Sequence, residues 1–177
     1  MKETRVIVIE NKDDLDGVIW VNFARARDNQ RFTLTKLQVK DGKAIATDGR
    51  RLHKYTPEEL VPDGLYDPLI INQNRVLLIE DGEGLKYPDT ERVCQIPAEV
   101  CGLSPYPDQA ISQILNRVHP ENYFNVGYLL AALKFGRASM FHYSGEENDM
   151  VHVRTIDGRY YAAIMPCSNR PKFRSEK

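Results

Sequence analysis

The side chains that most often do chemistry in proteins are not arranged here in any common catalytic or metal-binding pattern. The four histidines do not fall at metal-ligand spacing; they are His53, His119, His142 and His152. No G-x-S-x-G, P-loop or G-x-G-x-x-G run occurs. His142 and His152 are expected on consecutive strands, where a pair of histidines is more often structural than catalytic. The sequence therefore predicts no enzyme activity, no catalytic residue and no cofactor.

One acidic run and three cysteines are the remaining candidates for a metal or redox site. The acidic run could hold a cation, but such a run is more often a solvated turn; it comprises Glu80, Asp81 and Glu83. The cysteines have no C-x-x-C spacing; they are Cys94, Cys101 and Cys167. An odd number without that spacing indicates free thiols in a reducing cytoplasm. We therefore expect no metal site and a cytoplasmic location.

Composition and charge limit the class of partner. A chain of 177 residues with 42% hydrophobic content suits one domain, or two small lobes that share a core. The net charge of −1 gives no overall attraction to nucleic acid, so any DNA contact must be a local basic patch. The sequence has no apolar run of 18 residues, and its first residues lead into a strand-like run rather than a signal peptide. No membrane partner is expected.

The first 56 residues predict the element order β-α-β-β-β. Residues 5–9 are a β-branched run typical of a strand, and a helix is expected over 13–27, capped by Asn11 or Asp13. Residues 31–39 alternate apolar and polar side chains, as a half-buried strand does. Asp41-Gly42 and Asp48-Gly49 then mark tight turns that bound strands at 43–47 and 51–55.

The C-terminal part predicts the same order. A strand is expected at 123–125, a helix at 126–135 capped by Asn125, and strands at 139–143, 150–156 and 159–165. Between the two parts we expect strands at 68–72 and 75–80, a Pro-rich loop at 97–107 and a helix at 108–119. These patterns indicate a single α+β domain over 1–177 with two β-α-β-β-β lobes. The first lobe covers 3–56, the irregular middle 57–119, the second lobe 120–167 and a frayed tail 168–177.

Two short runs are the most informative part of the chain. Residues 46–52 read ATDGRRL and residues 160–166 read YYAAIMP. In this order they resemble the T-D-G-H-R-L run and the terminal V-M-P run of the bacterial sliding clamp, the β subunit of DNA polymerase III. Residues 31–34 (RFTL), 87–97 (YPDTERVCQIP) and 124–133 (FNVGYLLAAL) resemble further patches of that family. The chain departs from the family at Arg50, where the family usually has histidine, and in the residues that follow Met165-Pro166. It also has the length of one domain, whereas a clamp chain has three.

The resemblance implies a clamp-like fold, with antiparallel sheets outside and helices on one face. It also implies a groove, walled by the two runs, in which polymerases, the loader and repair proteins dock a short peptide. Carried over by position, its residues are Thr47, Gly49, Arg51, Leu52, Ala163, Met165 and Pro166. An apolar floor, an open turn and an arginine suit peptide capture. The alternative is that Asp48-Gly49 is only a turn and Met165 only core. In the family the two walls come from neighbouring domains, and whether one domain or two copies would join them here stays open.

The resemblance also implies DNA contacts, made to phosphates by basic residues on helices without base readout. The candidates are Arg25, Arg27, Arg117, Lys134 and Arg137. A solvated surface of mixed charge is the alternative, because the first helix also carries three aspartates. Trp20 lies off the apolar face of that helix, so it is either exposed for a protein contact or buried against the middle segment.

Three functions remain open from the sequence. The first is a clamp-like, replication-associated protein that assembles copies into a homo-oligomer and tracks or tethers on duplex DNA. The second is a clamp-derived module that never closes a ring and binds a protein or peptide partner, such as a polymerase. The third is an unrelated α+β domain with a different activity.

Overall fold

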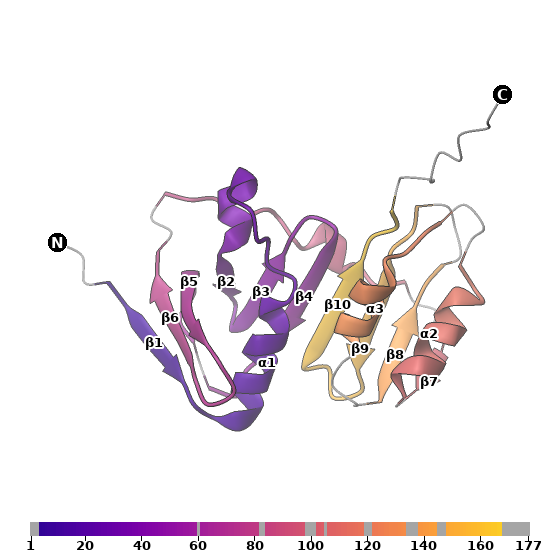
Figure 1. The fold of residues 1–177 in the computed structure, drawn as a ribbon, viewed down its shortest axis with the longest axis horizontal. Coiled ribbons are helices and arrows are strands. Elements are labelled where there is room, and N and C mark those ends of the chain that lie inside the picture. Colours follow the sequence, from indigo (N-terminus) through magenta and orange to yellow (C-terminus); the bar gives the residue numbers. More distant parts are fainter. Residues whose placement is uncertain are drawn as a thin grey trace.

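The computed structural model describes residues 4–59, 61–81, 84–97, 102–104, 106–118, 122–133, 138–144 and 148–167. Within these ranges ten strands form one antiparallel sheet in the order β1-β6-β5-β2-β3-β4-β10-β9-β8-β7 (Figure 1). The strands are β1 (Val6–Ile9), β2 (Leu37–Lys40), β3 (Lys43–Thr47), β4 (Arg51–Tyr55), β5 (Gly64–Ile71), β6 (Val76–Glu80), β7 (Gly102–Ser104), β8 (Ser139–His142), β9 (Val151–Thr155) and β10 (Tyr160–Ile164). The helices are α1 (Lys12–Asn22), α2 (Pro107–Leu115) and α3 (Val126–Ala132), with 3-10 turns η1 (Asn29–Thr35) and η2 (Arg92–Cys94).

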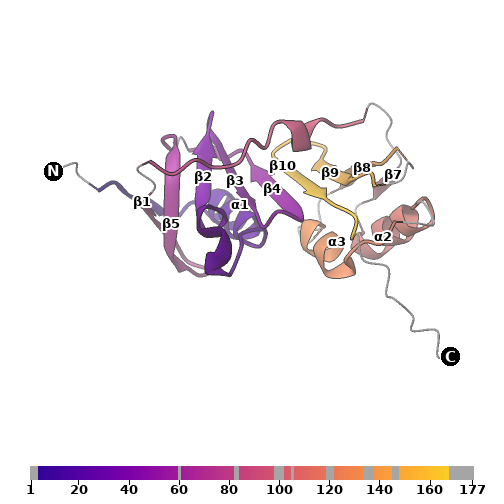
Figure 2. The same cartoon turned by 90° about the horizontal axis from the view of Figure 1, so that it is seen from above.

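The two faces of the sheet are covered differently. Figure 2 shows α1, α3 and α2 on one side of the sheet, and the segment 84–97, which contains η2, crossing the other side. The larger apolar cluster packs against the helices and includes Val18, Tyr55 and Leu129. The smaller cluster includes Leu52 and Tyr87 and is packed by partly buried side chains of η2 and its neighbours.

Strand β10 shows how the sequence fills both clusters. Its side chains alternate between the two faces, as the period of a strand requires. Tyr160, Ala162 and Ile164 belong to the helix-side cluster, whereas Tyr161 and Ala163 belong to the other. All five are buried, so a run of apolar residues here marks a strand covered on both faces.

The sheet is continuous because one edge strand of each half pairs with an edge strand of the other. Strand β4 pairs antiparallel with β10, which joins the half built from β1–β6 and α1 to the half built from β7–β10, α2 and α3. We call this β4–β10 pairing the seam. The expected α+β architecture, with antiparallel strands and helices on one face, is therefore present as one sheet that joins both halves of the described chain.

Local turn chemistry places several elements where the sequence predicts them. Strands β3 and β4 have the predicted bounds. Asp41 and Gly42 have φ of +51° and +68°, the left-handed pair that a two-residue hairpin needs. The Asn11 side chain accepts hydrogen bonds from the backbone N–H groups of Asp13 and Asp14 at 3.0 and 3.4 Å and so caps α1.

Two predictions in the first half are wrong. The first helix ends at Asn22 rather than near 27, because the chain turns inward there and buries Ala24 and Ala26. The predicted strand at 31–39 is η1 followed by β2, and the backbone N–H of Lys36 closes the last 3-10 turn on the carbonyl of Thr33.

The second half also departs from its predicted order. The segment at 123–125 forms only an isolated bridge between Tyr123 and Cys167, not a strand. The first strand of this half is β7, which lies inside the predicted Pro-rich loop and pairs with β8. Two helices, α2 and α3, then separate β7 from β8, so the half reads β-α-α-β-β-β.

Candidate functional site

The seam brings together the two runs that the sequence analysis singles out. In the β4–β10 register Leu52 is opposite Ala163, and Arg51 is opposite Ile164. The pairing continues past the strand end, where the backbone N–H of Met165 donates to the carbonyl of Arg50 at 2.9 Å. Both runs therefore meet within a single chain.

The turn between β3 and β4 is held by its own side chains. The Thr47 hydroxyl donates to the carbonyl of Arg51 at 2.7 Å and accepts from the N–H of Gly49 at 3.0 Å. Asp48 Oδ1 accepts from the backbone N–H groups of Arg50 and Arg51 at 2.9 and 3.1 Å. Gly49 has φ of +85°, a left-handed conformation that glycine adopts without strain. The turn is thus a rigid platform at one end of the seam.

A cavity of about 580 Å³ opens beside this turn. Its lining comes from the end of the α1 region, the β3–β4 turn and α3; the residues are Arg25, Ala26, Arg27, Asp28, Asp48, Arg50, Arg51 and Tyr128. We call it the arginine cavity. The Arg51 guanidinium lies 4.2 Å from the centroid of the Tyr128 ring, so it stacks on an aromatic face that forms one wall.

The charge in the arginine cavity is strongly positive for a chain of net charge −1. Four arginines and two aspartates line it, which leaves a net charge of +2. Arg51 Nε pairs with Asp48 Oδ2 at 3.1 Å. Burial and the neighbouring charge of Arg27 lower the pKa of Arg25 below its ordinary value. Burial is the larger of these two causes, and the negative charge of Asp67 opposes the shift.

The seven predicted groove residues take three different positions. Only Arg51 lines the arginine cavity. Gly49 and Met165 are exposed beside it and Pro166 is half-buried, whereas Leu52 and Ala163 are buried on the opposite face of the sheet, under η2. Thr47 is buried too, with its backbone N–H bonded to the Tyr87 hydroxyl at 3.1 Å.

The predicted DNA contacts do not form one surface among the described residues. Arg25 and Arg27 lie beyond the end of α1 and line the arginine cavity, while Arg117 is exposed just after α2. Lys134 and Arg137 lie outside the described residues. The exposed charged side chains of α1, α2 and α3 are one lysine and three aspartates, namely Lys12, Asp13, Asp16 and Asp108. The face that the helices present is thus not basic over these elements.

Sequence reasoning missed the aromatic wall. Tyr128 belongs to a run that resembles the clamp family, but nothing local to that run indicates that its ring meets Arg51. The sequence identifies Arg27 and Arg50 only as positively charged residues. The cavity that they line depends on contacts between segments that are distant in the sequence.

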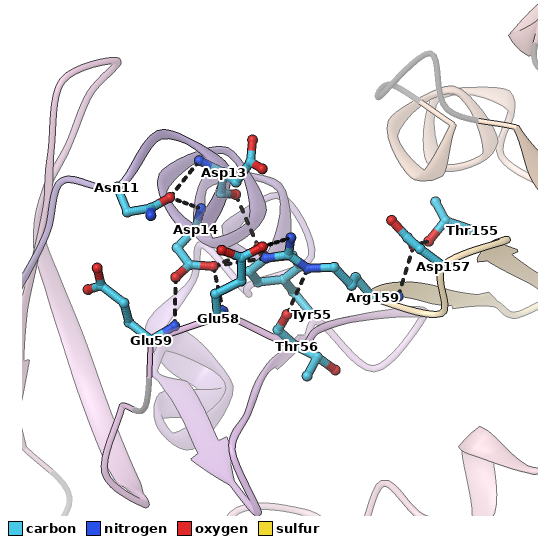
Figure 3. Close-up of polar contacts among 10 residues, drawn as sticks. All are labelled: Asn11, Asp13, Asp14, Tyr55, Thr56, Glu58, Glu59, Thr155, Asp157 and Arg159. Atoms are coloured by element: carbon cyan, nitrogen blue, oxygen red, sulfur yellow. Dashed lines mark hydrogen bonds and ion pairs between the residues drawn. The ribbon is translucent and has the colours of Figure 1, made fainter.

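A buried charge cluster holds the other end of the seam (Figure 3). Asp14 in α1 is 1% exposed and accepts from the Tyr55 hydroxyl at 2.8 Å and the backbone N–H groups of Glu58 and Glu59 at 2.9 and 3.0 Å. Arg159, from the turn before β10, pairs with Asp14 at 3.1 Å and with Glu58 at 2.7 Å. Burial and the bond to Asp14 raise the pKa of Tyr55, so the phenol stays a donor.

Trp20 adds a second link across the seam. It is 1% exposed, so the exposed alternative is wrong, and it contacts the second half of the sheet. Its indole N–H donates to the carbonyl of Ala131 at 2.9 Å, and its ring stacks on His53 with centroids 4.2 Å apart. Together with the Asp14 cluster, this fixes the two halves relative to each other and so positions the arginine cavity.

The two histidines expected on consecutive strands are buried there. His142 on β8 and His152 on β9 are cross-strand partners, and His152 Nδ1 lies 2.7 Å from the Tyr161 hydroxyl. Over the described ranges, no group of three or more His, Cys, Asp or Glu side chains could hold a metal ion. No helix in the same ranges is long and apolar enough to cross a membrane. Glu83, His119 and Cys101 lie outside the described residues.

The fold is that of solved bacterial sliding clamps. The β subunit of DNA polymerase III from Pseudomonas aeruginosa matches with a TM-score of 0.62 at 18% identity, over 96% of this chain and 68% of that chain. The β subunit from Streptococcus pyogenes gives 0.58 at 13% identity, over 96% and 67%. The one from Thermotoga maritima gives 0.60 at 12% identity, over 96% and 67%.

These matches establish a clamp-like fold. The sequence matches no protein-family model and no curated protein. The alignments extend over about two thirds of each clamp chain. At such low identity the likeness shows the fold alone.

Proposed function

We propose that this chain is a clamp-like docking module that captures a short peptide of a replication-associated partner, such as a polymerase, beside the β3–β4 turn. The observation that carries the proposal is the meeting of the two runs at the seam, next to a cavity of about 580 Å³. A cavity of that size suits a ligand of a few residues. The clamp-like fold supports replication as the setting.

The chemistry of the site supports a peptide as the ligand. Tyr128 and the exposed Met165 offer apolar and aromatic surface near the turn. Arg51, fixed between Asp48 and the Tyr128 ring, is a preorganised donor for a carbonyl or carboxylate oxygen. An aromatic anchor beside a held arginine is the combination that dominates binding at many interfaces.

Fluorescence anisotropy tests this proposal. The probes are labelled hexapeptides, each with one Leu and one Phe in an otherwise polar sequence that varies across the panel. At least one should bind, and Tyr128→Ala and Met165→Ser should each weaken it by roughly tenfold, the effect of about 1.4 kcal/mol at a hot spot. The matched controls are Leu130→Ala and Ile156→Ser, which change exposed apolar residues outside the arginine cavity. If no probe binds, or if the controls weaken binding equally, the proposal is wrong.

A second candidate function is assembly of copies into a ring that tracks on duplex DNA. It is favoured by the two ends of the sheet, because β1 and β7 each pair on one side only in the strand order. Val6 and Val8 on β1 and Leu103 on β7 are 50–54% exposed, as an edge that pairs with another copy would be before assembly. The absolute mass by light scattering, with and without duplex DNA, tests it: a monomer that ignores DNA excludes the ring.

A further inference from the structure

Two of the four arginines in the arginine cavity are exposed to solvent. Arg27 and Arg50 are exposed, and neither forms an ion pair with a described carboxylate. Asp28 also lines the cavity, but the net charge of the lining is still +2. An uncompensated pair of guanidinium groups beside a cavity is a binding site for anionic groups.

The other two arginines are already fixed by the fold. Arg25 Nε donates to Asn22 Oδ1 at 2.8 Å, and its Nη1 donates to the carbonyl of Thr35 at 2.7 Å. Arg51 is held by Asp48 and by the Tyr128 ring. Because these donors are already fixed, they lose little conformational entropy when a ligand binds. Their positive charge also stays at the cavity in the absence of a partner.

We infer that the docked peptide is acidic, with at least one Asp or Glu side chain or a terminal carboxylate placed between Arg27 and Arg50. This inference rests on the proposed docking function and names the chemistry of its ligand. A planar guanidinium donates two parallel hydrogen bonds to a carboxylate, which gives both affinity and orientation. Arg50 stands where the resemblance leads one to expect histidine, so the extra charge is a property of this chain.

The extent of the positive surface favours a peptide over duplex DNA. Binding to a duplex draws on several phosphates along a track, whereas the four arginines here lie around one cavity. The exposed charges of α1 and α2, three aspartates and one lysine, add no further basic track to the cavity. One or two carboxylates match this compact arrangement better than a polyanion does.

A pair of matched probes tests the inference. Both are labelled hexapeptides with one Leu and one Phe; one carries two Asp residues and the other has Asn at the same positions. The wild-type chain should bind the Asp probe at least roughly tenfold more tightly than the Asn probe, the ratio that about 1.4 kcal/mol gives. In R27Q/R50Q that ratio should fall towards one.

The control variant R92Q/R117Q removes the same charge from exposed positions outside the cavity and should keep the ratio. Equal binding of both probes by the wild-type chain would refute the acidic preference and leave the docking function standing. Binding of neither probe would remove the docking function and the preference together. A 20-base oligonucleotide provides the last test. If it displaces the Asp probe from the wild-type chain but not from R27Q/R50Q, the cavity is a phosphate site, and the inference is refuted.

Discussion

Removing the Asp14 carboxylate should destabilise the whole chain, because this side chain ties three segments together. It is 1% exposed and accepts from Tyr55, from the backbone of Glu58 and Glu59, and from Arg159 at 2.8–3.1 Å. Breaking a buried ion pair by removing one partner costs about 3–5 kcal/mol. Arg159 keeps its pair with Glu58, so we expect about 3 kcal/mol for Asp14→Ala.

Urea unfolding, followed by circular dichroism, measures this change as a difference in the free energy of unfolding. Asp16→Ala is the control, since Asp16 is exposed on the same helix and should change stability by no more than about 0.5 kcal/mol. If Asp14→Ala does not fold, Asp14→Asn keeps an acceptor oxygen and gives a milder loss. A loss below about 1 kcal/mol for Asp14→Ala would refute the argument, because even a single buried unsatisfied donor costs that much.

The pairing of Asp14 with Arg159 can be isolated by a double-mutant cycle. Arg159→Met removes the cation but leaves Asp14 with three neutral donors, so we expect a loss of about 1–3 kcal/mol. The two substitutions should not add, and their coupling energy should exceed about 0.5 kcal/mol. Additive losses would mean that the ion pair does not hold the seam.

Two further predictions concern the core beneath the seam. Gly17→Ala would place a Cβ 2.3 Å from the Tyr55 ring, so we expect a loss of about 1–3 kcal/mol in urea unfolding, and a smaller loss when the same substitution is made in a Tyr55→Leu background, where the ring is absent. Burial lowers the pKa of His53 to about 3, with Arg51 adding to the shift, and lowers the pKa of His152 to about 4, with His142 adding to it. Above pH ~6.5 both histidines are neutral in the folded and in the unfolded chain, so they do not make the free energy of unfolding depend on pH. Below pH ~6.5 the histidines of the unfolded chain bind protons while those of the folded chain stay neutral, so the free energy of unfolding decreases as the pH falls. Between that pH and ~4 each should contribute a slope of about 1.4 kcal/mol per pH unit, and His53→Gln and His152→Gln should each reduce the wild-type slope by that amount.

The elements that the sequence predicts well are those set by neighbouring residues. The Asp41-Gly42 hairpin needs two left-handed residues in a row, and few other dipeptides supply them at so little cost. Asn11 caps α1 through bonds to residues two and three positions away. Strands β3 and β4 follow from these turns and from their own alternation, so they keep their predicted bounds.

The elements that the sequence does not predict depend on distant partners. Strand β7 has three residues in a region rich in proline, and it is a strand only because β8 offers it an edge. The end of α1 at Asn22 follows from burial of Ala24 and Ala26 against segments that its own helical period does not reveal. A helical wheel could not decide whether Trp20 is exposed or buried, because the second half of the molecule, which contacts it, lies over a hundred residues away.

The candidate site, like the fold, could be predicted from the sequence only in part. The turn at Asp48-Gly49 and its contact with the second run were expected from the resemblance, but that resemblance assigned the two walls to neighbouring domains. Here the pairing of Leu52 with Ala163 joins them within one chain. The cavity beside them could not be predicted, since Tyr128 and Arg25 reach it from separate segments.

The position of the Asp14 cluster relative to the cavity links stability to binding. Strand β4 has its Arg51 end at the arginine cavity and its Tyr55 end at Asp14, so the seam is tied at both ends. Four residue steps of about 3.4 Å separate the two ends, a distance short enough for a rigid strand to transmit displacement. Because Arg50 and Tyr128 reach the cavity from opposite halves, a seam that opened at Asp14 would move one wall against the other. The buried charges at the Tyr55 end of β4 therefore serve the site by holding its two walls in register.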